Sequence, residues 1–123
     1  LTCLPEELPV NETLELAKHL QDADHDIATV VLNEMSHADL PEPAEWARVR
    51  EQVATHADSS IRQAGTLTDR WIARMGRQQQ ARQRLEGAIE APLATLPLLA
   101  DRSLGFPELQ QLSHALAEEL SDQ

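Results

Sequence analysis

Several residue types that define common function classes are scarce in this chain. Only one of its 123 residues is a cysteine, Cys3, which excludes an internal disulfide and a zinc site built from several cysteines. There is no tyrosine, and no apolar run approaches the roughly 20 residues that a membrane-spanning helix needs. The first residues lack the basic segment that opens a secretory signal. We therefore expect no transmembrane segment and a reducing, cytoplasmic location.

Glycine and lysine are too few and too dispersed for a phosphate-binding loop. Such a loop needs glycines whose exposed backbone N–H groups hold the phosphates, and usually a lysine directly after them. The chain's four glycines are far apart, its single lysine is Lys18, and no Gly-Lys pair occurs. There is no Gly-x-Ser-x-Gly elbow, and the five histidines lack the spacing of a zinc hydrolase helix. By itself this chain should hydrolyse no nucleotide, and we identify no catalytic residue and no metal ligand in it.

Negative charge dominates, because 21 acidic residues against 10 basic residues give a formal net charge of −11. This balance argues against a nucleic-acid partner, which would require clustered lysines and arginines. The charge is uneven, since residues 62–84 contain six arginines and one acidic residue, Asp69. This basic segment can fold onto its acidic flanks or face a partner.

The dominant residue types, Ala, Leu, Glu, Gln and Arg, are strong helix formers. The clearest helix is predicted over residues 107–120, where leucines at 109, 112, 116 and 120 form one apolar stripe. Further helices are predicted over residues 12–20, 45–56 and 61–89. Within the last of these, residues 78–82 are polar apart from Ala81, so we expect them to be exposed.

Short apolar runs at three places do not fit helices. Residues 27–32 are rich in β-branched and apolar side chains and are bounded by Asp26 and Asn33, which is typical of a strand buried on both faces. Residues 93–99 are similar, and residues 1–4 could be the end of a third strand in which Cys3 is a small buried hydrophobe. Strands separated by helix-length intervals predict βαβ units, and therefore an α/β fold with a mainly parallel sheet.

Three motifs stand in an order and spacing that point to a known family. They are Leu4-Pro5-Glu6-Glu7 with the Glu12-Thr13 pair opening a helix; Val30-Val31-Leu32-Asn33-Glu34 ending a strand; and Leu96-Pro97-Leu98-Leu99-Ala100 followed by Gly105-Phe106 and an amphipathic helix. Together they resemble the carboxyl-terminal part of the arsenical-pump-driving, or anion-transporting, ATPases. The same family includes the ATPases that target tail-anchored membrane proteins. The resemblance covers most of the chain and leaves residues 35–91 only loosely matched.

The resemblance implies a helix-rich segment of a doubly wound P-loop NTPase sheet, with the phosphate loop upstream of Leu1. Asn33 takes the position at which the family contacts adenine, and a carboxamide can both donate to and accept from an adenine edge. Pro97 and Leu98 take the position of the loop that closes over the base, beyond the carboxyl ends of the strands. The intact protein would bind ATP and Mg, with the magnesium ligands outside this chain. The implied partners are a second copy in a homodimer or the upstream part of the same ATPase, and a membrane-protein client or an anion pump.

The chain departs from the family at three points. Glu34 stands where the family usually has Gln or Arg, and Arg102 stands where a Glu and an Arg usually precede the glycine. The Cys-x-x-Cys pair that binds zinc in eukaryotic targeting members is absent, so we expect no zinc.

On this interpretation residues 1–123 are one segment of an ATPase domain. It would comprise a strand, helix and strand over 1–34, a helical insert over 43–90, and the last strand, adenine loop and terminal helix over 93–120. A second interpretation starts from the scarcity of β-branched residues and from the basic segment between acidic flanks. It is a mainly helical, acidic protein-interaction domain without catalysis.

Overall fold

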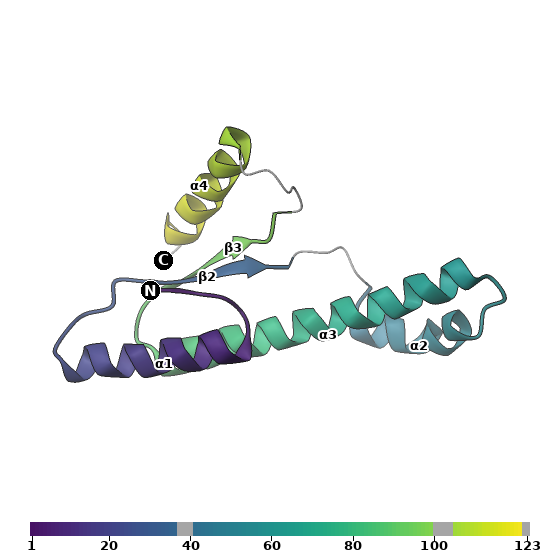
Figure 1. Cartoon of the computed structure of the whole chain (residues 1–123), viewed down its shortest axis with the longest axis horizontal. Helices are drawn as coiled ribbons and strands as arrows, with labels where there is room; N and C mark the ends of the chain where they lie inside the picture. The colour runs from purple at the N-terminus through teal and green to yellow at the C-terminus, as the bar shows by residue number, and fades with distance from the viewer. Residues whose placement is uncertain (37–40, 100–104, 122–123) are drawn as a thin grey trace. The chain divides into compact units, whose positions relative to one another are not determined.

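The computed structural model describes residues 1–36, 41–99 and 105–121, and its architecture is α/β. In chain order its elements are β1 (Thr2–Cys3), α1 (Glu7–Asp22), β2 (Val30–Met35), α2 (Pro43–Ala54), α3 (Ser59–Ala88), β3 (Leu93–Pro97) and α4 (Phe106–Ser121), as labelled in Figure 1. The chain divides into two compact units. One consists of Leu1–His37 with Arg77–Gln123, and the other of Ala38–Gly76.

The three strands form one parallel sheet in the order β1-β2-β3. The central strand β2 pairs on one side through Cys3 with Leu32, and on the other side through Val30 with Leu93. The expected α/β class and the parallel pairing of these strands are therefore confirmed. Membership of the P-loop NTPase superfamily is a finer statement and stays a prediction.

The strand β2 begins and ends three residues later than the apolar run at 27–32 predicts. Its ladder starts at Val30, whose N–H donates to the carbonyl of Pro92 at 2.8 Å. Just before the strand, the Thr29 carbonyl accepts from the Leu1 nitrogen at 2.8 Å, and the Thr29 hydroxyl donates to the Pro92 carbonyl. Ile27 packs against the core without belonging to the strand. The apolar pattern located the strand, but the residues that pair with β2 determine where it begins and ends.

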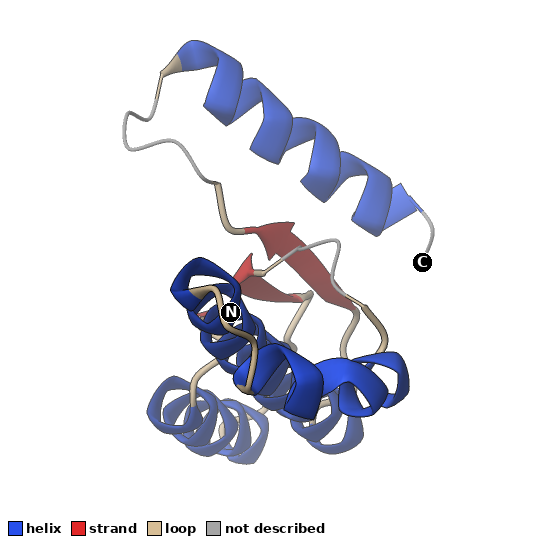
Figure 2. Ribbon diagram, turned by 90° about the vertical axis from the view of Figure 1, so that its right-hand side faces the viewer, coloured by secondary structure: helices blue, strands red, loops and turns tan. Residues whose placement is uncertain are grey.

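The main hydrophobic core lies where α1 and the carboxyl-terminal part of α3 pack against the sheet. Its buried members are Cys3, Val10, Ala17, Val30, Leu32, Ala81, Leu85 and Ile89. Arg84 of α3 donates to the Asn11 carboxamide of α1 at 2.7 Å, which links the two helices at the surface. In Figures 1 and 2 these helices lie on one side of the strands and α4 lies on the other.

The expectation that residues 78–82 are exposed is wrong for Gln78 and Ala81, which are only 3% and 7% exposed. Both lie on the stripe of α3 that also carries the fully buried Leu85, because residues three and four apart share one face of a helix. Position along the helix therefore determined their burial, whereas the polarity of the segment suggested the opposite.

The terminal helix α4 confirms the prediction for residues 107–120. It contacts β3, and the Thr95 hydroxyl donates to the Glu119 carboxylate at 2.7 Å across this contact. At its start, the Gly105 N–H donates to Glu108 at 2.8 Å and so satisfies one of the free donors of the helix terminus. Leu112 and Leu116 are half-buried, so only part of the apolar stripe is covered.

The second unit contains α2 and the first part of α3, close to the bounds predicted for both helices. The two helices approach closely at Gly65, where an added Cβ would lie 2.5 Å from the Val53 Cγ1 atom. The Trp46 indole N–H donates to Asp69 at 2.8 Å, and Arg50 pairs with the same carboxylate at 2.9 Å. These contacts join the two helices within the unit.

Among the described residues, no helix combines the length and the apolar character needed to cross a membrane.

Candidate functional site

The carboxyl ends of β2 and β3 meet at one edge of the sheet, because the two strands are parallel. Met35 pairs with Pro97, and the Leu98 N–H donates to the Met35 carbonyl at 2.8 Å. We call residues 33–36 together with Pro97 and Leu98 the carboxyl edge. The segments that carry the three sequence-predicted site residues, Asn33, Pro97 and Leu98, thus lie side by side.

Asn33 does not end its strand as the sequence suggested. It lies two residues before the end of β2, because pairing with Pro97 and Leu98 continues the strand to Met35. Asn33 is half-buried, and within the described parts of the chain its carboxamide makes no hydrogen bond. The N–H donors and the carbonyl acceptor of the Asn33 side chain therefore have no partner among the described residues.

A β-bulge separates Asn33 from the end of the strand. The register passes from Leu32 with Thr95 to Met35 with Pro97, so β2 has one more residue than β3 over this stretch. Glu34 has a φ of 62°, a left-handed conformation that is uncommon for a residue other than glycine. Bulges of this kind change where side chains point and are common beside functional sites.

The bulge also explains how the side chains of β2 are distributed. In an unbroken strand Glu34 would lie on the same face as the buried Val30 and Leu32, since side chains alternate. With the extra residue, Glu34 is exposed and Met35 packs against the core instead. The bulge therefore keeps a carboxylate out of the core while Asn33 stays on the opposite face from Leu32.

Gln78 of α3 supplies hydrogen bonds that β1 does not provide at this point. The last pair between β1 and β2 joins Cys3 to Leu32, and among the residues that the structure describes no strand accompanies β2 further on that side. The Gln78 Nε2 atom donates to the Glu34 carbonyl at 3.2 Å, and its Oε1 atom accepts from the Ser36 N–H at 2.9 Å. Gln78 is 3% exposed, so its carboxamide acts as a buried substitute for a peptide group of a neighbouring strand.

Gln78 was not predicted from the sequence as a residue of this region. The signal that could have found it is its spacing of three and seven residues from Ala81 and Leu85, which places it on their face of the helix. A polar side chain at a core-facing position needs a buried partner. The sequence alone does not indicate which backbone groups fill that role.

Ser36 contributes a second unused polar group. It is 6% exposed, and its hydroxyl finds no hydrogen-bond partner among the residues that the structure describes. A buried hydroxyl without a partner typically costs about 1–3 kcal/mol. The next residue, His37, lies outside the described residues, as does Arg102.

Glu34 is the one charged side chain of the carboxyl edge, and it is exposed. The Asn33 carboxamide is half-buried and Leu98 is 37% exposed, whereas the Ser36 hydroxyl is buried. No lysine or arginine belongs to the edge as defined, so these residues cannot neutralise a phosphate chain. Within the described ranges, no group of three or more His, Cys, Asp or Glu side chains could hold a metal ion.

The second unit has a hollow of about 120 Å³ between α2 and α3, lined in part by Trp46, Arg50, Gly65 and Asp69. Pockets that hold drug-sized ligands usually measure about 300–1,000 Å³. The Trp46 hydrogen bond, followed by Arg50, lowers the pKa of Asp69 below its usual range. This carboxylate is thus engaged in joining the two helices and is not free to act on a ligand.

Comparison with models of known protein families gives no match for this sequence, and no curated protein matches it.

Proposed function

We propose that this chain is the carboxyl-terminal part of an ATPase of the arsenical-pump-driving and membrane-protein-targeting type, and that it supplies part of the adenine pocket. The phosphate loop and the magnesium ligands then lie upstream of Leu1, in keeping with the absence of a Gly-Lys pair in this sequence. The intact protein binds ATP and couples its hydrolysis to a conformational change in a cytoplasmic homodimer. Its client is a membrane protein or an anion pump.

The observation that carries the proposal is the pairing of Met35 with Pro97 at the ends of two parallel strands. The two motifs matched to the family's adenine contacts lie 60 residues or more apart in the sequence, yet they are neighbours at the carboxyl edge. Ligands of open parallel sheets bind beyond the carboxyl ends of the strands. The arrangement therefore supports a shared role for Asn33, Pro97 and Leu98.

The residue types determine which part of the base each side chain contacts. The Asn33 carboxamide can accept from the exocyclic amine of adenine and donate to a ring nitrogen. Leu98 is 37% exposed and can contact the apolar face of the base. Since the edge has no cation of its own, these residues recognise the base and leave the phosphates to the upstream part of the protein.

The first experiment is the intact mass of the purified protein together with its amino-terminal sequence. The proposal expects a mass well above that of 123 residues and a Gly-x-x-x-x-Gly-Lys segment upstream of Leu1. A mass that corresponds to 123 residues would require the ATPase function to be abandoned for this molecule.

The second experiment measures the Kd of the full-length protein for ATP and for inorganic tripolyphosphate. Asn33→Ala should raise the Kd for ATP about tenfold, because it removes hydrogen bonds to the base. The Kd for tripolyphosphate, which has no base, should not change. Asn11→Ala is the matched control, since Asn11 bonds to Arg84 away from the carboxyl edge. An equal effect of both variants on ATP would contradict the assignment.

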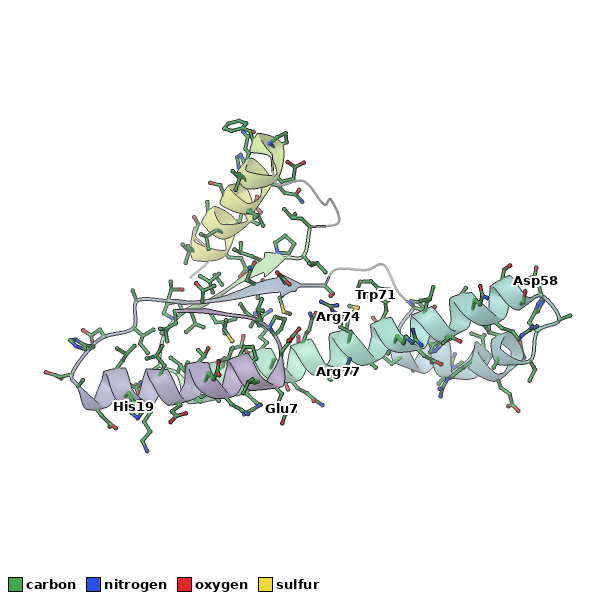
Figure 3. All side chains as sticks on the ribbon, viewed as in Figure 1. Glu7, His19, Asp58, Trp71, Arg74 and Arg77 are labelled. Atoms are coloured by element: carbon green, nitrogen blue, oxygen red, sulfur yellow. The ribbon has the colours of Figure 1, made fainter. Side chains whose placement is uncertain are left out.

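A second candidate function is a protein-interaction module without catalysis. The observation in its favour is the exposed surface of α3 within the second unit, where Leu67 is 55% exposed and Trp71 is 37% exposed. Arg74 lies over the Trp71 ring at 5.8 Å from its centroid, and both are labelled in Figure 3. This function is favoured if the protein binds no ATP and if a partner protein binds it only while Leu67 and Trp71 are intact.

A further inference from the structure

The Asn33–Ser36 segment departs from the conformation of a regular strand. Glu34 has to adopt a positive φ, which is unfavourable for a residue with a Cβ. Residues held in such regions persist only where the surrounding structure fixes them. The constraint must act on the backbone next to Glu34.

Gln78 makes bonds at the required places. One bond ends on the Glu34 carbonyl, and the other ends on the Ser36 N–H, so the carboxamide spans the peptide groups that follow the left-handed residue. On the other side of the strand, the Met35 carbonyl accepts from the Leu98 N–H. The end of β2 is thus held from both sides, by β3 on one and by a single side chain on the other.

We infer that Gln78 is a positioning residue for the base-binding site: it holds the bulge that presents Asn33 at the carboxyl edge. This inference rests on the proposed function. Without these two bonds, Glu34 is expected to relax towards the ordinary β region, and the bulge in which Asn33 and Glu34 together lie opposite Leu96 would rearrange. Asn33 then loses its fixed orientation, although Gln78 itself touches no ligand.

The alternative is that Gln78 only stabilises the fold. A purely structural role predicts a lower melting temperature with unchanged nucleotide affinity. A positioning role predicts a loss of affinity that requires both the base and Asn33. The two roles are separated by measuring ATP and tripolyphosphate binding in the same variants.

The test uses Gln78→Met in the full-length protein, because methionine approximates the length of glutamine and lacks its hydrogen bonds. We expect the Kd for ATP to rise about tenfold and the Kd for tripolyphosphate to stay within twofold. Gln79→Met is the matched control on the exposed neighbouring position, and it should change neither value. In the double variant with Asn33→Ala, Gln78→Met should add no further loss, since it acts through Asn33.

A second variant and a second readout cover the case in which Gln78→Met fails to fold. Gln78→Glu keeps an acceptor for the Ser36 N–H and loses the donor to the Glu34 carbonyl. In Gln78→Met, hydrogen exchange at the Ser36 amide should accelerate about tenfold or more relative to the Val30 amide, which donates to Pro92. In Gln78→Glu the Ser36 amide keeps its acceptor and should stay protected, while the Kd for ATP rises because the bond to the Glu34 carbonyl is lost. Accelerated exchange in Gln79→Met, or an unchanged Kd for ATP in Gln78→Glu, would overturn the inference.

The remaining outcomes distinguish this inference from the proposed function. If Asn33→Ala weakens ATP binding and the Gln78 variants do not, the positioning role is wrong and the adenine site stands. Additive losses in the double variant would also overturn the positioning role. If the wild-type protein binds no ATP, both the proposed function and the inference that rests on it are wrong.

Discussion

The Trp46 indole N–H donates to the Asp69 carboxylate at 2.8 Å, and this bond joins α2 to α3 across 23 positions of sequence. Arg50 pairs with the same carboxylate at 2.9 Å. The basic segment at 62–84 contains one acidic residue, and that residue holds the helical pair together. Its role is therefore internal to the second unit.

The helical pair should lose stability in acid through Asp69. Because the folded protein lowers the pKa of this carboxyl, its ionised form stabilises the fold above the unfolded pKa of about 3.9. This contribution is lost as the pH falls through the lower folded pKa. Thermal melts from pH 7 to pH 2 should show that Asp69→Asn is less stable than wild type at neutral pH, with a difference that vanishes in acid.

Trp46→Phe provides a companion variant, since it keeps an aromatic ring and removes the donor that contributes most to the lowered pKa. Because the folded pKa of Asp69 is then lowered less while its unfolded pKa is unchanged, the acid loss should be smaller and should be complete at a higher pH than in the wild type. A constant difference between Asp69→Asn and wild type at all pH values would contradict the assigned role of the charge.

Gly65 and Gly76 should respond in opposite directions to the same substitution. Alanine is favoured over glycine within helices by roughly 0.5–1 kcal/mol. At Gly76 an added Cβ meets nothing within 4 Å, so Gly76→Ala should stabilise the protein by about that amount. At Gly65 the Cβ would lie 2.5 Å from the stiff side chain of Val53, and overpacking of this kind costs about 1–3 kcal/mol.

Urea unfolding of the two alanine variants checks this prediction, with the free energy of unfolding compared at equal m-values. Stabilisation by Gly65→Ala would show that α2 and α3 do not approach as closely as Val53 and Gly65 indicate.

Truncation of Leu85 should be among the most costly changes in the chain. Leu85 is fully buried in the core that also contains residues of the sheet and of α1, so Leu85→Ala removes apolar contacts and leaves a cavity. Such substitutions typically cost about 2–5 kcal/mol. Leu67→Ala, on the same helix but 55% exposed, should change the free energy of unfolding by about 0.5 kcal/mol or less. Similar losses in both variants would mean that the exposed stretch of α3 is covered in solution.

Cys3 should react slowly with thiol reagents while the protein is folded. It is 4% exposed, and burial raises the pKa of its thiol above the usual range, so little thiolate forms at pH 8. The reaction should become fast once a denaturant unfolds the chain. Rapid labelling of the native protein at pH 8 would show that β1 detaches from the sheet.

The sequence alone predicted much of the fold because its local signals agree with the final structure. The heptad-like leucines of α4 and the β-branched run before Asn33 identified elements of the correct type in the correct order. Element ends were less accurate, since β2 runs to Met35 only because Pro97 and Leu98 pair with it. Such pairing joins residues more than 60 positions apart, so no pattern in the local sequence indicates it.

In the candidate site, too, the sequence predicted some features and the tertiary structure decided others. Asn33, Pro97 and Leu98 were chosen from motifs, and whether they bind adenine stays a prediction. Their proximity follows from the register of β2 and β3, which no motif encodes. Gln78 was expected to be exposed because its neighbours are polar, yet the helical period places it beside Leu85 in the core.

By itself the sequence determined the α/β class, the order of the elements and the excess of negative charge, because these depend on local propensity, apolar period and composition. Only the tertiary structure fixed the bulge at Glu34, the burial of Gln78 and the position of the Ser36 hydroxyl, which has no partner among the described residues. The physical reason is that each of these depends on whether a backbone or side-chain polar group meets a partner. Those partners come from elements that are distant in the chain and become neighbours only when the sheet and α3 pack together.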